Sequence, residues 1–277
     1  MKGTKGFALL WITGALCVAM ISLSSVAPAW AQSEKRTVFA PDNFHWHGDL
    51  RPGQTLEVIN TNGEIDASGA SGGEARAESI RRGSDDDREL FVEVVEYSDG
   101  VTICAVQARE MKPGRCHRGG VSSESFGGWN WHHARVNFDV QVLRGVRFHA
   151  MTTNGNVVGR GLNSVVEASI TNGNVAVSTS EWGSARTTNG GVHVSMGSAK
   201  WDGELEVKTT NGSVDVTLPA SAAFKVHAAT TNGKIHTDFP ITVQGSLSSK
   251  NLSGEVGGGG RELRVVTTNG TIKLTKS

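Results

Sequence analysis

Three residues with acid–base and metal-binding side chains share one position of a repeated motif. The motif Thr-Asn-Gly occurs seven times in the 277 residues, and the third residue after its glycine is His193, Asp215 and His236 in three successive copies. If these copies stack, the three side chains form one column, which could bind a divalent metal ion or act as an acid–base pair. The two histidines would lie about 9.6 Å apart at the backbone, two strand spacings, which is wide for one shared ion. A polar outer face without a ligand is therefore the favoured interpretation.

Aromatic and imidazole side chains gather in two further segments. Residues 44–47 read Phe-His-Trp-His, and a later segment contains Trp129, Trp131, His132 and His133. Exposed tryptophan can stack on sugar rings, and histidine can bind transition metals. A stack of repeats must also cover its open ends, so these segments could instead form terminal caps. We favour the caps, and the two roles do not exclude each other.

Carboxylates that could serve an enzyme are few. Asp202, Glu204 and Glu206 alternate along one predicted strand and would lie on one side of it. No Gly-x-Ser-x-Gly, phosphate-binding loop or His-Glu-x-x-His motif occurs. We therefore predict no enzymatic activity, no metal site and no cofactor. A carbohydrate-active enzyme is the alternative, because parallel β-helices also carry polysaccharide lyases and hydrolases.

The repeated motif predicts the elements that would position these residues. Each copy lies between short segments in which apolar and polar residues alternate, such as 205–207 and 214–216, and this alternation predicts half-buried strands. Asn-Gly between such strands is typical of a hairpin in an antiparallel meander. In a β-solenoid, however, identical Asn side chains can bond in a ladder along the stack, which rewards repetition of the same residue. The solenoid is therefore favoured, with these ladder residues: Asn62, Asn154, Asn172, Asn189, Asn211, Asn232 and Asn269.

Three details of this ladder can be compared with a structure. We expect the Asn211 amide to be buried between Asn189 and Asn232, and Asn269 to lie nearer the open end. Glycine would supply a left-handed backbone at each corner. A degraded copy at 251–256 would form one further coil.

The patterns together predict an all-β, single-domain β-solenoid, a stack like a parallel β-helix. About seven regular C-terminal coils would occupy 152–277, and a less regular β region with a disulfide-tied insertion loop would occupy 50–151. Residues 32–49 would form an N-terminal cap or linker, and residues 1–31 a signal peptide.

The first residues have the features of an export signal. Lys2 and Lys5 precede a mainly apolar run at 7–23, and the Ala-Trp-Ala at 29–31 fits signal peptidase. An uncleaved membrane anchor is the alternative. We expect a mature chain that starts at Gln32, has no membrane span, and resides in the periplasm, at the cell surface or outside the cell.

Cysteine content and charge restrict the remaining possibilities. Cys104 and Cys116 are the two cysteines after residue 31, and an even count in an exported protein predicts a disulfide. Two unlinked thiols are the alternative. Without residues 1–31 the chain has 25 basic and 27 acidic residues, which does not favour a nucleic-acid partner.

The sequence resembles the bacterial putative-adhesin family of exported β-solenoid repeat domains. The resemblance covers about residues 50–277. It rests on the Thr-Asn-Gly-x-Val units, the strand at 101–106 and the strand from Val136 to Gly145. It implies a non-enzymatic surface or periplasmic module with a binding or structural role. It implies no catalytic residue, and its partner could be a glycan or another surface protein.

Overall fold

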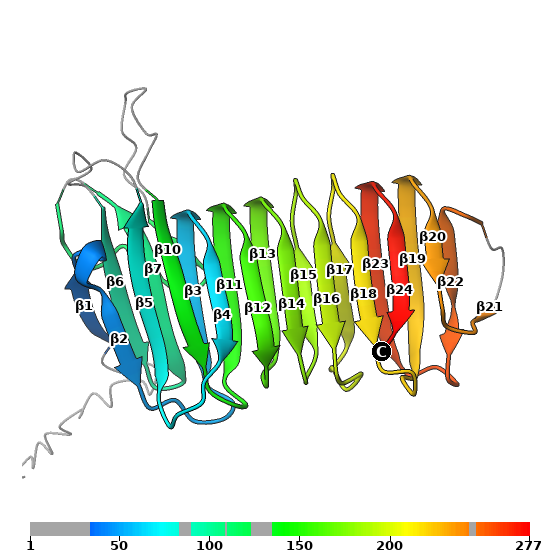
Figure 1. Cartoon of the computed structure of the whole chain (residues 1–277), viewed down its shortest axis with the longest axis horizontal. Helices are drawn as coiled ribbons and strands as arrows, with labels where there is room; N and C mark the ends of the chain where they lie inside the picture. The colour runs from blue at the N-terminus through cyan, green and yellow to red at the C-terminus, as the bar shows by residue number, and fades with distance from the viewer. Residues whose placement is uncertain (1–33, 83–89, 109, 123–134, 244–247) are drawn as a thin grey trace, which may run out of the picture. The chain divides into compact units, whose positions relative to one another are not determined.

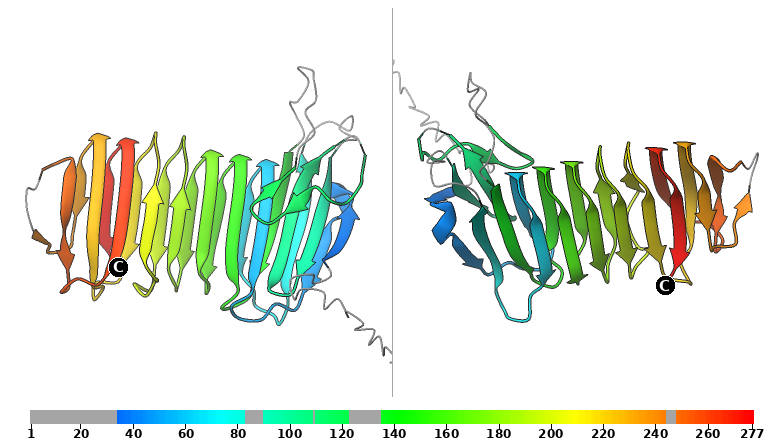
Figure 2. Two further views of the ribbon diagram at one scale, coloured as in Figure 1. Left: turned by 180° about the vertical axis from the view of Figure 1, so that it is seen from behind. Right: turned by 45° about the horizontal axis from the view of Figure 1, so that its top comes forward.

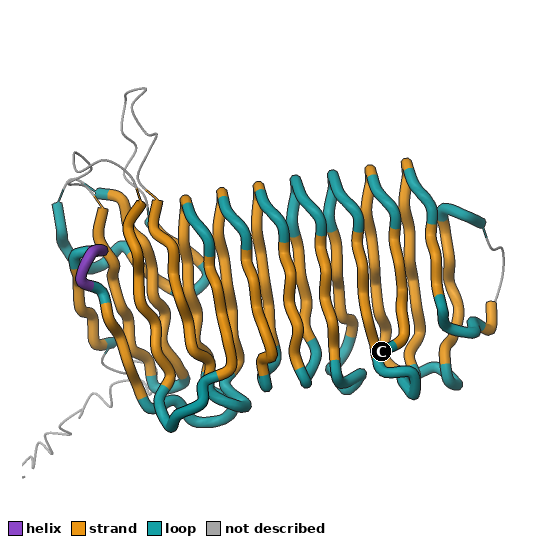
Figure 3. Tube along the Cα trace, viewed as in Figure 1, coloured by secondary structure: helices purple, strands orange, loops and turns teal. Residues whose placement is uncertain are grey.

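Two long β-sheets lie face to face along a stack of coils (Figure 1). The computed structural model describes residues 34–82, 90–108, 110–122, 135–243 and 248–277, and Ser33–Ser277 form one compact unit. Strands dominate these residues, whose one helix is the short 3-10 helix η1 (Pro41–Asn43) (Figure 3).

Sheet A contains 12 strands among the described residues. Their order across the sheet is β1 (Lys35–Phe39), β6 (Leu90–Tyr97), β7 (Gly100–Gln107), β3 (Thr55–Asn62), β11 (Arg147–Asn154), β13 (Val166–Asn172), β15 (Gly183–Arg186), β17 (Glu204–Lys208), β23 (Arg261–Asn269), β19 (Phe224–Asn232), β22 (Asn251–Val256) and β21 (Thr242–Val243).

Sheet B contains 10 strands within the part of the chain that the structure describes. Their order is β2 (His45–Gly48), β5 (Ala75–Arg82), β10 (Arg135–Val142), β4 (Ile65–Gly69), β12 (Val157–Leu162), β14 (Val175–Thr179), β16 (Val192–Met196), β18 (Val214–Leu218), β24 (Ile272–Lys276) and β20 (Ile235–Thr237). A separate hairpin consists of β8 (Cys116–His117) and β9 (Gly120–Val121).

Each regular coil contains one strand of sheet A, a Thr-Asn-Gly corner and one strand of sheet B. Equivalent strands pair in parallel and in register, so that Asn154 lies opposite both Asn62 and Asn172. The same parallel register continues in sheet B, where Val175 lies opposite Val157 and Val192. This pairing confirms the β-solenoid and excludes an antiparallel meander for the repeats.

The alternation of residue types explains the core between the sheets. In β18 the side chains of Val214, Val216 and Leu218 are buried, while the residues between them are half-buried on the outer face. Val and Ala are the commonest residues at the inward positions of the middle coils. Larger rings also lie in the core, such as Phe44 near β2 and Trp201 before β17.

The coils do not stack in the order of the chain. β23 and β24, the last coil in sequence, lie between β17–β18 and β19–β20 (Figure 2). The expected further coil at 251–256 is wrong, because these residues form β22, which pairs antiparallel with β19. Four successive glycines, 257–260, all with positive φ, then return the chain to β23.

Candidate functional site: a groove beside the disulfide hairpin

Three kinds of hydrogen bond connect the corners of neighbouring coils. In stack order, the side-chain Nδ2 of each corner Asn donates to Oδ1 of the Asn before it, at 2.7–2.8 Å. The N–H of each Gly donates the other way, to the backbone carbonyl of the Asn after it, at 2.8–3.0 Å. The first Thr of Thr-Thr-Asn-Gly is buried, and its hydroxyl donates to the Gly carbonyl of the preceding coil, at 2.8–3.3 Å.

The asparagine ladder is therefore confirmed, but two of its expected details are wrong. Its order is Asn62, Asn154, Asn172, Asn189, Asn211, Asn269 and Asn232, so Asn269 is an inner member and Asn232 is the last. The Asn211 side chain is bonded on both sides as expected, yet it is exposed rather than buried. The corner lies where the chain leaves one sheet for the other, so this side chain points away from the core.

The corner glycine is required by close approach more than by a left-handed helix-like conformation. A Cβ on Gly190 would lie only 2.0 Å from the Gly173 carbonyl oxygen, far below the van der Waals contact distance, and a similar clash occurs at Gly233 with Gly270. Gly190 has a φ of 145°, an extended conformation of positive φ, which L-residues rarely adopt. The expectation of the αL region is thus corrected, although glycine remains obligatory there.

The fold does not use the side chain of the threonine that directly precedes each corner Asn. In all seven copies this residue is exposed, and its hydroxyl has no hydrogen-bond partner within the part of the chain that the structure describes. In stack order the residues are Thr61, Thr153, Thr171, Thr188, Thr210, Thr268 and Thr231. Beside the ladder amides they form a long, uncharged polar ridge.

The column of His193, Asp215 and His236 does not form as expected. His193 lies opposite Asp215, but Lys273 stands between Asp215 and His236 because β24 is inserted between their strands. An ammonium group within the column opposes the binding of a cation. No group of three His, Cys, Asp or Glu side chains placed to hold a metal occurs among the described residues.

The disulfide hairpin lies over the outer face of sheet A near β6 and β7 (Figure 2). The disulfide is confirmed between Cys104 of β7 and Cys116 of β8. Cys116, Phe91 and Val95 contribute to a second small core beneath the hairpin, separate from the main one. This explains why β7 is buried on both faces, unlike the amphipathic strands of the repeats.

A fully buried carboxylate holds the start of this hairpin. Glu93 of β6 accepts hydrogen bonds from the backbone N–H groups of Gly114, Arg115 and Cys116, at 2.6, 3.0 and 2.9 Å, and from Arg36, at 3.0 Å. Burial alone raises the pKa of Glu93, but these four donors outweigh it and hold the pKa below its ordinary value.

A second buried carboxylate holds the hairpin turn. Glu57 of β3 accepts hydrogen bonds from the hydroxyl of Thr102, at 2.8 Å, and from the N–H of Gly119. It also lies 2.8 Å from Nδ1 of His149 on β11. Burial opposes ionisation of both groups, yet their pairing lowers the pKa of Glu57 and raises that of His149.

These charged residues had not been identified from sequence. The sequence feature that could have identified them is a charged residue within a strand that is apolar on both faces. Glu93 follows Phe91 and Val92 and precedes Val94 and Val95, and Glu57 lies in a similar run.

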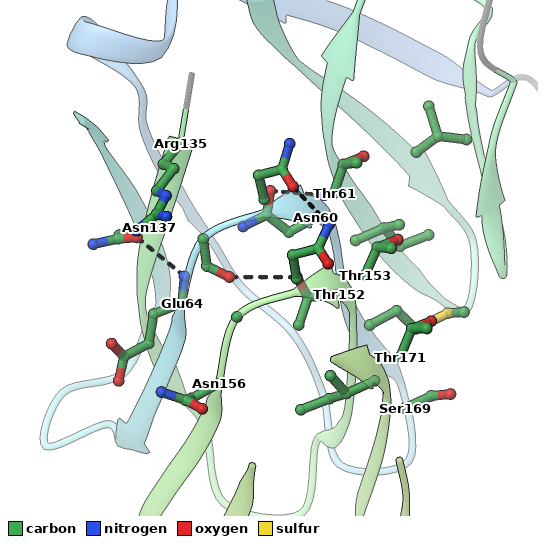
Figure 4. Close-up of a pocket in the computed structure, with 18 of the residues that line it drawn as sticks. Asn60, Thr61, Glu64, Arg135, Asn137, Thr152, Thr153, Asn156, Ser169 and Thr171 are labelled. Atoms are coloured by element: carbon green, nitrogen blue, oxygen red, sulfur yellow. Dashed lines mark hydrogen bonds between the residues drawn. The ribbon is translucent and has the colours of Figure 1, made fainter. Parts of the chain in front are cut away.

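A groove with a volume of about 1290 Å³ runs between the hairpin and the first corners of the repeat. Gly120 and Val121 of the hairpin line the groove. Thr61, Thr153 and Thr171 of three stacked corners also line it (Figure 4). Ile59 and Met151 add apolar surface. Among the described lining residues only Glu64 and Arg135 are charged. The groove can therefore offer hydroxyl and amide hydrogen bonds beside a small apolar area.

The two aromatic and imidazole segments contribute no described lining residue to this groove. Trp129, Trp131, His132 and His133 are outside the described residues. In the other aromatic segment, Phe44 and Trp46 are buried at the end of the stack, and His45 and His47 are exposed.

Of the acidic residues considered for an enzyme, Glu206 lies beside three basic side chains. The carboxylate of Glu206 lies 3.1 Å from Arg186, 3.1 Å from Lys208 and 3.7 Å from Arg264. Those ion pairs account for its charge.

The sequence profile of the family described as Toastrack DUF4097 matches residues 53–275, which is most of the chain. The chain belongs to this Toastrack family. The matched residues include both the hairpin and every Thr-Asn-Gly corner, so the groove lies wholly within the Toastrack region.

A comparison with solved structures finds two that are similar to the Toastrack chain. One is described as a "putative cell adhesion protein" from Clostridium sporogenes, with 13% identity, a TM-score of 0.39, and coverage of 88% of this chain and 99% of that one. The other is described as a "putative adhesin" from Bacteroides fragilis, with 8% identity, a TM-score of 0.25, and coverage of 86% and 100%. No curated protein matches the sequence. The described part of the chain contains no helix with the length and apolar character of a membrane span.

Proposed function

We propose that this Toastrack protein is an exported, non-enzymatic binding module of the cell surface or periplasm, and that the groove beside the disulfide hairpin binds its ligand. The observation that carries the proposal is the row of Thr61, Thr153 and Thr171. Their exposed hydroxyls are unused by the fold, and they line the groove at the regular spacing of stacked strands.

Export is supported by the N-terminal sequence and by the disulfide. Disulfides persist in the oxidising compartments outside the cytosol, and Cys104 and Cys116 are both fully buried in the folded chain. Mass spectrometry of the mature protein tests this part. We expect Gln32 at the N-terminus, and an intact Met1 would contradict cleavage.

A neutral glycan is the ligand class that suits the groove. Hydroxyl and amide side chains pair with sugar hydroxyls, and Ile59 and Met151 can contact the apolar faces of sugar rings. The described lining contains only one acidic and one basic residue. This low number of charges disfavours a strongly charged ligand. Another surface protein is the second partner class to be distinguished by experiment.

The repeat supplies a matched pair of variants for the test. Thr153→Lys places a long cation in the groove, whereas Thr210→Lys makes the same change at the equivalent exposed corner position outside it. On a glycan array followed by titration, we expect wild type and Thr210→Lys to bind the same neutral glycans. Thr153→Lys should weaken binding at least about tenfold, which corresponds to 1.4 kcal/mol.

Two results would overturn parts of this proposal. Equal binding by both variants would exclude the groove as the site. Absence of any glycan bound by the wild type would exclude the glycan class and leave a protein partner to be sought.

A further inference from the structure

The polarity of the ladder makes its last member chemically different from the other six. In stack order, the first six corner glycines, from Gly63 to Gly270, each donate their N–H to the Asn carbonyl of the next coil. Gly233 follows Asn232, the last Asn of the stack, and among the described residues no carbonyl accepts its N–H. The Asn232 side chain donates to Asn269 but accepts no hydrogen bond from the described part of the chain.

The first coil of the ladder does not share this property. The Nδ2 of Asn62 lacks a ladder partner, but the N–H of Gly63 still donates to the carbonyl of Asn154 at 2.8 Å. Since the backbone bonds all run in one direction, one end of the stack leaves a corner glycine N–H without an acceptor among the described residues.

Asn-Gly pairs undergo a self-reaction that needs this nitrogen. The backbone nitrogen of the glycine attacks Cγ of the asparagine, a C–N bond forms, the Cγ–Nδ2 bond breaks, and ammonia leaves with the proton lost by the nitrogen. Water then opens the resulting five-membered imide at either carbonyl, which yields aspartate or isoaspartate. Glycine favours the attack because it has no side chain to hinder the approach.

We infer that Asn232 is a spontaneous deamidation site in the folded protein and that the ladder protects the other six Asn-Gly pairs. At an inner pair such as Asn211-Gly212, the nitrogen donates to Asn269, and the amide is bonded at both Nδ2 and Oδ1. Attack there requires local opening that breaks these bonds first. At Asn232 a single amide bond holds the side chain, and the nucleophile is free of any described partner.

Conversion of Asn232 changes the end of the ladder. The Nδ2–H that donates to Asn269 at 2.8 Å is replaced by a carboxylate oxygen, which faces the Oδ1 of Asn269. Isoaspartate also adds one carbon to the backbone between β19 and β20. The protein would therefore gain negative charge at one end of the stack as it ages.

Peptide mapping tests the inference directly. Cleavage after Lys and Arg places the seven Asn-Gly pairs in seven different peptides, with Asn232 in residues 226–234. After incubation of the folded protein at mildly alkaline pH, we expect deamidation at Asn232 to be at least about tenfold faster than at Asn211 or Asn269, because opening by 1.4 kcal/mol already gives that factor. In denaturant the rates should become similar, since each pair is then an unprotected Asn-Gly.

A variant separates backbone protection from side-chain protection. Asn232→Ser makes Asn269 the last amide of the ladder, but the N–H of Gly270 can still donate to the carbonyl of residue 232. Asn269 should therefore remain slow in this variant. Similar rates at all seven pairs in the folded wild type would overturn the inference, and rapid reaction of Asn269 in Asn232→Ser would show that the amide bonds, not the glycine nitrogen, decide the rate.

Discussion

Replacement of Glu93 by Gln is a direct test of how the disulfide hairpin is attached. The carboxylate accepts four hydrogen bonds, three of them from consecutive backbone N–H groups at 114–116. Glutamine retains one acceptor oxygen, but its NH2 group faces N–H donors with which it cannot form a hydrogen bond. Hydrogen bonds to a charged group contribute about 1.5–3 kcal/mol each. Arg36 is partly exposed, so water can replace part of the hydrogen bond that it loses. We expect the free energy of unfolding to fall by about 3–4 kcal/mol at neutral pH.

The same variant predicts a pH dependence. The pKa of Glu93 is lower in the folded protein than in the unfolded chain, so its contribution is present above the unfolded pKa and is lost as pH falls through the folded pKa. The difference in stability between wild type and Glu93→Gln should therefore shrink at acid pH.

Urea denaturation at several pH values measures this difference, and hydrogen exchange at the amides of 114–116 reports the hairpin separately. Glu96→Gln on the same strand is the control, because Glu96 forms an exposed pair with Lys35 and no other ion pair with a described residue. Such an exposed pair contributes less than about 1 kcal/mol. A loss below about 1 kcal/mol for Glu93→Gln at neutral pH would refute the reasoning. So would a difference that does not change with pH.

Three further variants address the corners and the disulfide. Asn211→Asp removes the Nδ2–H that donates to Asn189, so that a carboxylate oxygen faces the Oδ1 of Asn189. Because the corner is exposed to water, we expect the free energy of unfolding, measured by urea denaturation, to fall by about 1–2 kcal/mol at neutral pH. The loss should be smaller once the acid is protonated. Thr209→Val removes the hydroxyl that donates to the Gly190 carbonyl and should lower the free energy of unfolding by about 1 kcal/mol in the same assay. Cys104→Ser should reduce stability by about 3 kcal/mol under oxidising conditions and show no difference from wild type under reductant, by thermal melting.

Each of these variants has an internal control. Asn62→Asp should be milder than Asn211→Asp, because Asn62 only accepts within the ladder and aspartate can still accept from Asn154. Ile170 already occupies the position equivalent to Thr209, so an apolar side chain fits there and unchanged stability of Thr209→Val would mean that the hydroxyl contributes nothing. A deficit of Cys104→Ser that persists under reductant would indicate a packing defect instead.

Local patterns sufficed to predict the solenoid and its ladder, because each corner repeats the same residues and each strand alternates. Such local patterns do not predict the order in which the coils stack. The copies that end in Asn232 and Asn269 have the same four-residue motif, so nothing local shows which one packs against Asn211. The groove was missed for a related reason. The hairpin that lines it is attached through backbone N–H groups that donate to Glu57 and Glu93. The residue types of the hairpin do not show which of its backbone N–H groups donate.

The position of the last coil has a consequence for how the chain is completed. β23 and β24 fill the interior of the stack, so a chain that ends before residue 261 would lack an inner layer rather than an end. The facing edges of β17 and β19 would then have no strand between them, and unpaired edges promote association with other chains. If the chain crosses a membrane from its N-terminus, β23 and β24 arrive only after the coils on both sides of them. Loss of β23 and β24 should therefore be more damaging than loss of the last coil in a solenoid whose coils stack in chain order.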